Sequence, residues 1–126
     1  MTNKIDFYIN ESPTSYHALA ELILNLEKNG IYIHTDDANQ ANEISKVFWA
    51  HPKDRFIAHS LATHLPQSVI ELGYKDIPKE RSFIINASSN QLARVHIEWV
   101  SYQKDKARQR YQYWKKAGFT LETHIK

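Results

Sequence analysis

Basic and aromatic side chains gather in one segment of this sequence, residues 104–116. The segment has six basic residues and one acid, Asp105, whereas the remaining chain has ten Lys and Arg against thirteen Asp and Glu. The overall charge of +2 at pH 7 is therefore produced locally. Such a segment is typical of a site for an acidic partner, which can be nucleic acid, a phosphorylated ligand or an acidic stretch of protein. Its basic and aromatic residues are Lys104, Lys106, Arg108, Arg110, Tyr111, Tyr113, Trp114, Lys115 and Lys116.

Helical spacing sorts these side chains into faces. At about 100° per residue, one apolar stripe should pack on the body of the protein. Lys104, Arg108 and Lys115 fall together at one border of that stripe, and Lys106 and Arg110 flank the other side. Repulsion between like charges at i,i+4 costs a few tenths of a kcal/mol, which favours a ligand-binding role over a solvated face. The stripe consists of Val100, Ala107, Tyr111, Trp114 and Gly118.

Residues that could perform catalysis are scattered. His59 and His64 lie five positions apart, no His-Glu-x-x-His motif occurs, and Ser60 lacks the context of a hydrolase nucleophile. The sequence has no cysteine. After His34, the pair Thr35–Asp36 could mimic the end of a catalytic strand, but these residue types favour a helix cap. We expect no enzyme activity and no metal site.

Nucleotide-binding motifs are missing as well. The three glycines lie far apart, and the first predicted turn between a strand and a helix, residues 10–14, has neither paired glycines nor a phosphate-binding lysine. We therefore expect no bound cofactor.

The elements that must position the basic segment follow a regular order. A strand is predicted at 4–9, a helix at 15–29, a strand at 31–34, and a helix that Thr35 or Asp36 caps and that ends before Pro52. Further strands are predicted at 56–58, 69–72, 82–86 and 95–99, then the basic helix and a short extended tail at 119–125. Alternation of strands and helices predicts an α/β, Rossmann-like three-layer domain whose central sheet is mainly parallel (mixed) and flanked by helices.

Composition places the chain in a broad class. With 126 residues and 42% hydrophobic content, we expect a single domain over 1–126. No apolar stretch approaches the ~20 residues of a membrane span, and the first residues lack a signal-peptide layout. These features predict a cytoplasmic protein with no membrane association.

Trp49 is the second informative position. Ala41, Ile44 and Phe48 already form the apolar stripe of their helix, so Trp49 points about 100° away, near Phe56. A tryptophan in this place either anchors a protein interface or closes the edge of the core.

Three blocks of this sequence resemble the chi subunit of the bacterial DNA polymerase III holoenzyme. They are Phe7-Tyr8-Ile9, the run from Phe48-Trp49-Ala50-His51-Pro52 to Ser60-Leu61, and the run from Ala107-Arg108-Gln109-Arg110-Tyr111 to Ala117-Gly118-Phe119. The resemblance extends in order over nearly the whole chain, and the second and third blocks together are fairly specific.

The resemblance implies a non-enzymatic adaptor with a Rossmann-like sheet and no bound nucleotide. Members of this family pair with the psi subunit, which tethers them to the clamp loader, and capture the acidic C-terminal tail of single-stranded DNA-binding protein. Carried over by position, Lys104, Arg108 and Tyr111 correspond to the tail site, and Trp49 and Phe56 to the psi interface. Lys115 is added to the tail site from its helical position.

This chain departs from the family pattern at three places. Gln112 stands where relatives carry a lysine, the segment 87–94 is short and lacks a small helix, and the 62–68 loop is trimmed. A second function remains open, in which the basic helix binds single-stranded nucleic acid directly, with Tyr113 or Trp114 stacking on bases.

Overall fold

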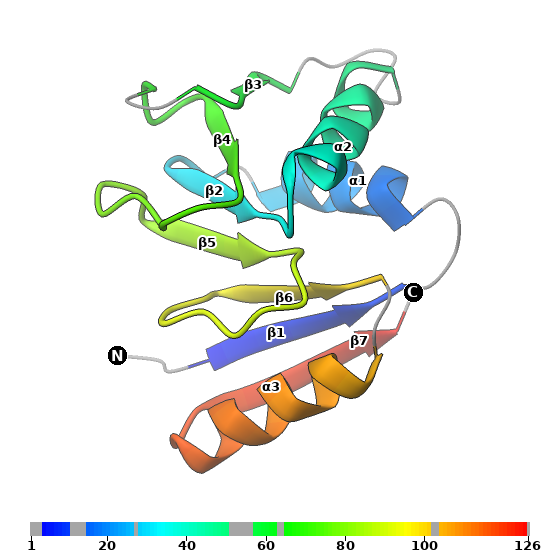
Figure 1. Ribbon diagram of the computed structural model, residues 1–126, viewed down its shortest axis with the longest axis vertical. Coiled ribbons are helices and arrows are strands. Elements are labelled where there is room, and N and C mark those ends of the chain that lie inside the picture. Colours follow the sequence, from blue (N-terminus) through cyan, green and yellow to red (C-terminus); the bar gives the residue numbers. More distant parts are fainter. Residues whose placement is uncertain are drawn as a thin grey trace.

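Seven strands form one sheet in which every described pairing is parallel, and three helices flank it (Figure 1). A computed structural model describes residues 4–10, 15–26, 28–50, 57–62, 65–101 and 104–125. The spatial order of the strands is β3-β4-β2-β5-β6-β1-β7, which confirms the predicted Rossmann-like α/β fold. The strands are β1 (Lys4–Ile9), β2 (Ile31–His34), β3 (His59–Ser60), β4 (Ile70–Gly73), β5 (Phe83–Asn86), β6 (Ile97–Val100) and β7 (Thr120–Ile125), and the helices are α1 (Ser15–Leu26), α2 (Ala38–Ala50) and α3 (Lys104–Lys116).

The helices lie on the two faces of the sheet and make three layers. Leu19 of α1 and Ile44 of α2 share an apolar cluster with Ile33 of β2. Trp114 of α3 packs instead with Phe7 of β1 in a second cluster. In β1, Tyr8 packs against the first cluster and the adjacent Phe7 belongs to the second. Because successive side chains of a strand point to opposite faces, α3 lies on the face opposite α1 and α2. In Figure 1, α1 and α2 lie beside the half of the sheet that contains β2 and β4, and α3 runs along β1 and β7.

The connections explain this division. Moving from β1 through β2 to β3, the chain crosses one face by way of α1 and α2. On its return to β5, β6 and β7 it crosses the other face, where Ile77 and Leu92 of two connecting segments pack on Tyr32 and Ile84. Right-handed crossovers between parallel strands require this reversal of face when the direction across the sheet reverses. Segment 87–94 contains no helix, as predicted.

The cap of α2 differs from the prediction. The Asp37 carboxylate accepts a hydrogen bond from the backbone N–H of Gln40 at 2.9 Å, so Asp37 is the N-cap. The expectation that Thr35 or Asp36 caps this helix was wrong. The Thr35 hydroxyl donates to a carbonyl at the end of β4, and the Asp36 carboxylate accepts from both the backbone and the hydroxyl of Ser89. At the carboxyl edge of the sheet, these bonds connect the segment that follows β2 with the end of β4 and with the segment that follows β5.

Other element boundaries also differ from the prediction. α1 ends at Leu26, three residues before the predicted Asn29. Of the strand predicted at 56–58, Phe56 lies outside the described residues, and pairing with β4 begins at His59. The segment predicted as an extended tail is a full strand, β7, which pairs with β1 in parallel at all six of its positions.

A tight turn after α3 brings the chain back to the sheet. Gly118 has a φ of +93°, and its N–H donates to the carbonyl of Lys115, while the N–H of Phe119 donates to the carbonyl of Trp114. The rings of Phe119 and Trp114 pack edge to face at 5.0 Å. This pair of hydrogen bonds with its apolar contact is the Schellman motif, which requires the left-handed conformation that glycine adopts without strain. The turn directs β7 alongside β1.

Candidate functional site

A cleft of about 400 Å³ opens between α3 and the carboxyl ends of β1 and β7. All three residues that the family resemblance implies for the tail site, Lys104, Arg108 and Tyr111, line this cleft. Its other lining residues are largely apolar, so the cleft joins two cations to an apolar wall. The complete lining is Phe7, Ile9, Val100, Lys104, Ala107, Arg108, Tyr111, Thr123 and Ile125.

Strand alternation and one small residue create the space. Phe7 and Ile9 occupy alternate positions of β1, and Thr123 and Ile125 occupy alternate positions of β7, so all four face α3. Ala107 is the residue of α3 directly above them, and it is 8% exposed. Because alanine has no side chain beyond Cβ, the helix packs on the sheet without filling the cleft.

Tyr111 forms one wall of the cleft. Its side chain is half-buried, and its ring meets the ring of Phe7 edge to face at a centroid distance of 5.3 Å and an interplanar angle of 66°. Such edge-to-face pairs are favourable because the positive ring edge meets the negative ring face. The contact fixes the tyrosine beside the two cations, where its ring is available to stack with a ligand.

Arg108 is exposed and only weakly paired within the molecule. Its guanidinium lies 3.7 Å from the carboxylate of Asp105, and the two side chains are 80% and 93% exposed. Exposed ion pairs of this kind contribute about 0–1 kcal/mol. A carboxylate ligand with better geometry can therefore replace Asp105 at little cost.

Lys115, which was added to the site from its helical position, lies about two turns beyond Arg108 and outside the cleft lining. A second hollow, of about 450 Å³, extends along the outer side of α3 and shares Arg108 with the cleft. Lys116 is the second basic residue of this hollow, and Gln112 and the half-exposed Tyr113 form much of its remaining surface. The cationic surface of α3 thus continues from the cleft along the helix by way of Arg108.

Arg110, which was predicted to flank the apolar stripe, is buried and does not belong to the exposed cationic surface. It is 3% exposed, and its Nε donates to the carboxylate of Glu98 in β6 at 2.9 Å. The same carboxylate accepts hydrogen bonds from Trp114 Nε1 at 3.0 Å and Asn86 Nδ2 at 2.9 Å. Burial raises the pKa of Glu98, whereas Arg110 and the two neutral donors favour its charged form. This network attaches α3 to the sheet.

Sequence reasoning missed this network, although a signal was present. Glu98 stands in the middle of an otherwise apolar strand, and a buried carboxylate requires hydrogen-bond donors and a cation. The choice of Arg110 among six basic residues depends on the rotation of α3 against the sheet, which helical spacing alone gives only to within about one residue.

Trp49 lies away from the cleft, at the end of α2. Its side chain is 62% exposed, and its ring lies 5.1 Å from the ring of His59. Phe48 next to it is 2% exposed, so the helix buries one aromatic residue and presents the other. Phe56, the second residue predicted for this surface, lies outside the described residues. Since α2 and α3 cover opposite faces of the sheet, the Trp49 surface and the cleft are separate.

The histidines and serines weighed as catalytic candidates have structural partners where they are described. The Nδ1 of His59 binds the carbonyl of Ile57 at 2.7 Å, and its Nε2 binds the hydroxyl of Ser45 at 2.9 Å. The hydroxyl of Ser60 accepts from the backbone of Ala62 at 3.2 Å. His64 lies outside the described residues. His59 is therefore held as a core residue, with both ring nitrogens engaged.

The edge of the sheet where parallel α/β proteins bind nucleotides carries acidic residues. A hollow of about 570 Å³ lies there, beyond the ends of β2 and β5, and Asp36, Asp37 and Glu43 contribute to its lining. Neighbouring strands whose connections leave to opposite faces create such a crevice. Carboxylates at this place repel phosphate, and the Asp36–Ser89 hydrogen bonds already join its two sides.

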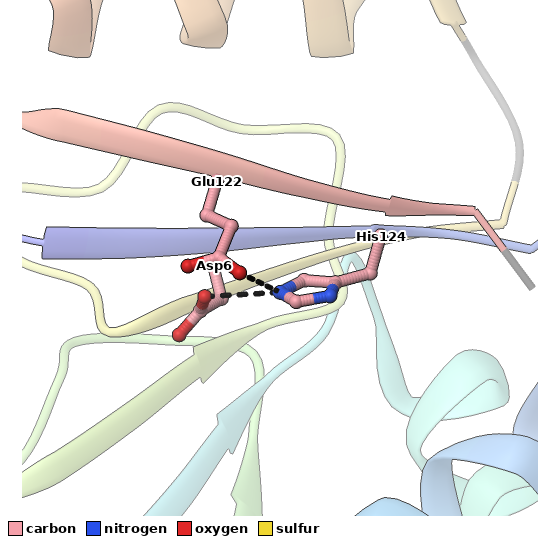
Figure 2. A group of neighbouring side chains, drawn as sticks. All are labelled: Asp6, Glu122 and His124. Carbon is pink, nitrogen blue, oxygen red and sulfur yellow. Dashed lines mark hydrogen bonds and ion pairs between the residues drawn. The ribbon is translucent and has the colours of Figure 1, made fainter.

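Three potential metal ligands meet on the face of β1 and β7 opposite α3: Asp6, Glu122 and His124 (Figure 2). The Nε2 of His124 lies 3.1 Å from the Asp6 carboxylate and 3.8 Å from that of Glu122. The ammonium group of Lys4 is within 2.5 Å of Glu122 and 3.6 Å of Asp6. Lys4 therefore provides the positive charge that a metal ion would bring, and the group serves to join β7 to β1.

None of the helices in the part of the chain that the structure describes has the length and apolar character needed to cross a lipid bilayer. The described residues thus form a parallel α/β domain with acidic residues at the carboxyl edge of its sheet and a cleft that pairs two cations with an apolar wall, an arrangement suited to an acidic ligand with an apolar part.

The chain belongs to the DNA polymerase III chi subunit family. The profile of this family, described as DNA polymerase III chi subunit, HolC, matches residues 1–122. The DNA polymerase III subunit chi of Escherichia coli K12 is 25% identical over 93% of this chain and 94% of its own length. The corresponding subunit of Pseudomonas aeruginosa PAO1 is 24% identical over 96% of this chain and 95% of its own length. The resemblance drawn from the three sequence blocks is confirmed.

Proposed function

We propose that this protein is a non-catalytic adaptor of cytoplasmic DNA replication. Its cleft binds the acidic C-terminal tail of single-stranded DNA-binding protein, and a psi-like partner links it to the clamp loader of DNA polymerase III. The observation that carries this proposal is the convergence of Lys104, Arg108 and Tyr111 on one cleft with an apolar wall. Membership in the chi subunit family supports the setting in the holoenzyme.

The chemistry of the cleft matches the end of an acidic peptide that terminates in an aromatic residue. The Arg108 guanidinium and the Lys104 ammonium offer charge-assisted hydrogen bonds to the terminal carboxylate. The aromatic ring can enter the cleft against Phe7, Ala107 and Tyr111, because a cleft of about 400 Å³ is within the size range of small-ligand pockets. The two cations of the cleft thus match the terminal carboxylate, and its apolar wall matches the aromatic ring.

Other cations of α3 act at longer range. Lys115 and Lys116 lie further along the helix, where they can attract the acidic residues that precede the peptide end. This attraction is screened beyond roughly 8 Å in physiological salt. Affinity for one peptide should be on the order of micromolar. Several tails presented on one DNA strand raise the effective concentration and strengthen the attachment.

The psi-like partner is assigned to the Trp49 surface. An exposed tryptophan at the end of a helix has the area and polar handle that interface anchors use. The assignment of Phe56 to the same surface rests on its correspondence with the family pattern. Because α2 and α3 lie on opposite faces of the sheet, both partners can bind together.

Direct binding of nucleic acid is the competing function for the same helix. It would use the basic residues of α3 on phosphates, but Arg110 is buried and committed to Glu98. The acidic hollow at the carboxyl edge of the sheet also disfavours a polyanion. In the proposed function, DNA is contacted only indirectly, through the single-stranded DNA-binding protein.

A calorimetric titration tests the proposal. The probe is a synthetic ten-residue peptide rich in aspartate that ends in phenylalanine, with a free carboxylate or a terminal amide. Arg108→Glu should weaken binding of the free-acid peptide by about tenfold or more, since it removes a charge-assisted hydrogen bond and adds repulsion. The amide peptide should lose most of its affinity for the native protein for the same reason.

Lys106→Glu is the matched control, because it makes the same charge reversal on an exposed residue of the same helix outside the cleft lining. It should reduce peptide affinity far less than Arg108→Glu. Equal losses in both variants would show that only net charge matters. Tight binding of an unmodified oligonucleotide with a steep salt dependence would favour the nucleic-acid function instead.

A further inference from the structure

The outer edge of β7 is an open strand edge beside the cleft. β7 pairs with β1 on one side, and within the described residues no strand pairs with its other side. Proteins usually protect such edges with proline, lysine, a bulge or a very short strand. β7 has six residues in unbroken register, contains no proline, lysine or arginine, and has Glu122 as its single acid.

This edge is firmly held by contacts on the face away from α3. His124 of β7 contacts Asp6 of β1 at 3.1 Å, and its ring stacks on Tyr8 at a centroid distance of 4.4 Å and an interplanar angle of 14° (Figure 2 shows the polar part of this group). Lys4 reinforces the attachment through Glu122. A strand fixed in this way presents its outward N–H and C=O groups in a preformed row.

The edge and the cleft form one continuous surface. Thr123 and Ile125 belong to β7 and also line the cleft, and Ile125 is 81% exposed. A segment added alongside β7 would therefore direct every second side chain toward the space below α3, beside Lys104 and Arg108. The remaining side chains would lie on the opposite face, next to His124.

We propose that the acidic peptide of the proposed function binds as an added strand on the outer edge of β7. Its main chain forms hydrogen bonds with alternate residues of β7, and its alternate side chains, with the terminal carboxylate, enter the cleft. This is β-augmentation, in which the main chain supplies affinity and side-chain pockets supply specificity. The inference rests on the proposed function and adds the way in which the peptide is held.

Charge complementarity selects an acidic peptide over a second copy of this chain as the occupant. Antiparallel pairing of two β7 edges about a two-fold axis would bring the amino-terminal part of one α3 toward the carboxyl-terminal part of the other. Lys104 and Arg108 of one copy would then face Lys115 and Lys116 of the other. Like charges opposed across an interface disfavour association, whereas an acidic strand meets the same residues as opposite charges.

Amide hydrogen exchange measured by NMR tests this inference on the native protein. On saturation with the free-acid peptide, alternate amides of residues 120–125 should exchange at least about tenfold more slowly, because only every second N–H of an edge strand points outward. Arg108→Glu at the same peptide concentration should show no such change. Among peptides that are N-methylated at one position each, the affinity should alternate from one position to the next. It should fall about three- to tenfold where methylation removes a peptide N–H that is bonded to β7.

The outcomes separate the two proposals. Undiminished peptide affinity with no change in exchange along β7, and with all N-methylated peptides equivalent, would overturn strand addition and leave the proposed function intact. Failure of the free-acid peptide to bind at all would overturn both. Protection of alternate β7 amides that appears with protein concentration in the absence of peptide would identify a second copy as the occupant and overturn the inference.

Discussion

At the residue scale, His96 shows how a single side chain can link protonation to the sheet. Its Nδ1 accepts a hydrogen bond from the backbone N–H of Ile84 at 3.1 Å, and its ring stacks on Phe83 at 4.9 Å. Burial lowers the pKa of His96, and the nearby charges of Arg94 and Lys28 lower it further. The neutral imidazole is therefore a structural part of the contact between β5 and β6.

Acid should weaken this contact. Because the pKa of His96 is lower in the folded protein, the unfolded chain binds more protons than the folded protein as the pH falls below about 6.5. The contribution of His96 to stability is therefore complete only above that pH. His34, whose pKa burial also lowers, acts in the same direction. His96→Asn keeps an acceptor for Ile84 but cannot titrate. In urea denaturation, the free energy of unfolding should decrease less between pH 7.5 and pH 5.5 for this variant than for the native protein. Equal decreases in both proteins would contradict the role assigned to His96.

At the same scale, the limits of sequence reasoning can be traced to particular residues. Lys104, Arg108 and Tyr111 could be placed together because helical spacing fixes their relative directions. The cap of α2 could not be assigned, since Thr35, Asp36 and Asp37 are all suitable caps and the choice depends on where β2 leaves the sheet. Lys115 was assigned to the site from its helical position, but it lies outside the cleft lining, because the extent of the cleft along α3 depends on β1 and β7.

At the scale of elements, the docking of α3 depends on a buried ion pair. Glu98 is fully buried, and its partners are Arg110 and Trp114 from the helix and Asn86 from β5. A buried pair contributes little net stability compared with apolar residues, but the loss of one partner leaves a charge without compensation. The pair therefore acts chiefly to fix the rotation of α3, which in turn points Lys104 and Arg108 at the cleft.

Removal of one partner should be costly. Arg110→Ala leaves the Glu98 carboxylate buried without a cation, and the free energy of unfolding should fall by about 3–5 kcal/mol in urea denaturation. Arg108→Ala, an exposed change on the same helix, should alter it by less than about 0.5 kcal/mol. The double variant Glu98→Leu with Arg110→Leu should recover part of the loss. If Arg110→Ala were as mild as Arg108→Ala, the ion pair would not hold the helix.

The strands show which elements sequence could predict. β2 and β5 were found near their true limits because they are short, largely apolar runs at the centre of the sheet. β1 was also found at its limits, although it contains Lys4 and Asp6 and lies next to the edge strand. β7 was expected only as an extended tail, since an edge strand needs few apolar residues and its partner, β1, lies at the other end of the chain. Helical or strand periodicity carries no information on such a distant pairing.

At the scale of the whole molecule, the two proposed surfaces are on opposite sides of the sheet. The cleft lies under α3, and Trp49 projects from the end of α2. Substitutions that are far apart and share no partner usually act independently. Separate apolar clusters on the two faces of the sheet support α2 and α3, so neither surface should depend on the other for its shape.

Independent action predicts a clean separation of phenotypes. Trp49→Ala should reduce co-purification with a psi-like partner and leave peptide affinity within about twofold, whereas Arg108→Glu should do the reverse. Co-purification and peptide titration, performed on both variants, check this expectation. Loss of peptide affinity in Trp49→Ala would mean either that Trp49 supports folding or that the two surfaces are wrongly divided, and a thermal unfolding profile would distinguish these explanations.

The position of β1 between β6 and β7 has a consequence for biosynthesis. β1 is translated first, yet both of its neighbours belong to the last third of the chain. In the nascent polypeptide, β1 therefore cannot pair with its neighbours until nearly the whole domain has left the ribosome. Until then it stays accessible to chaperones. The cleft, which is assembled from β1, α3 and β7, is then among the last features to form, so that ribosome-bound chains should be unable to bind the acidic peptide of the proposed function.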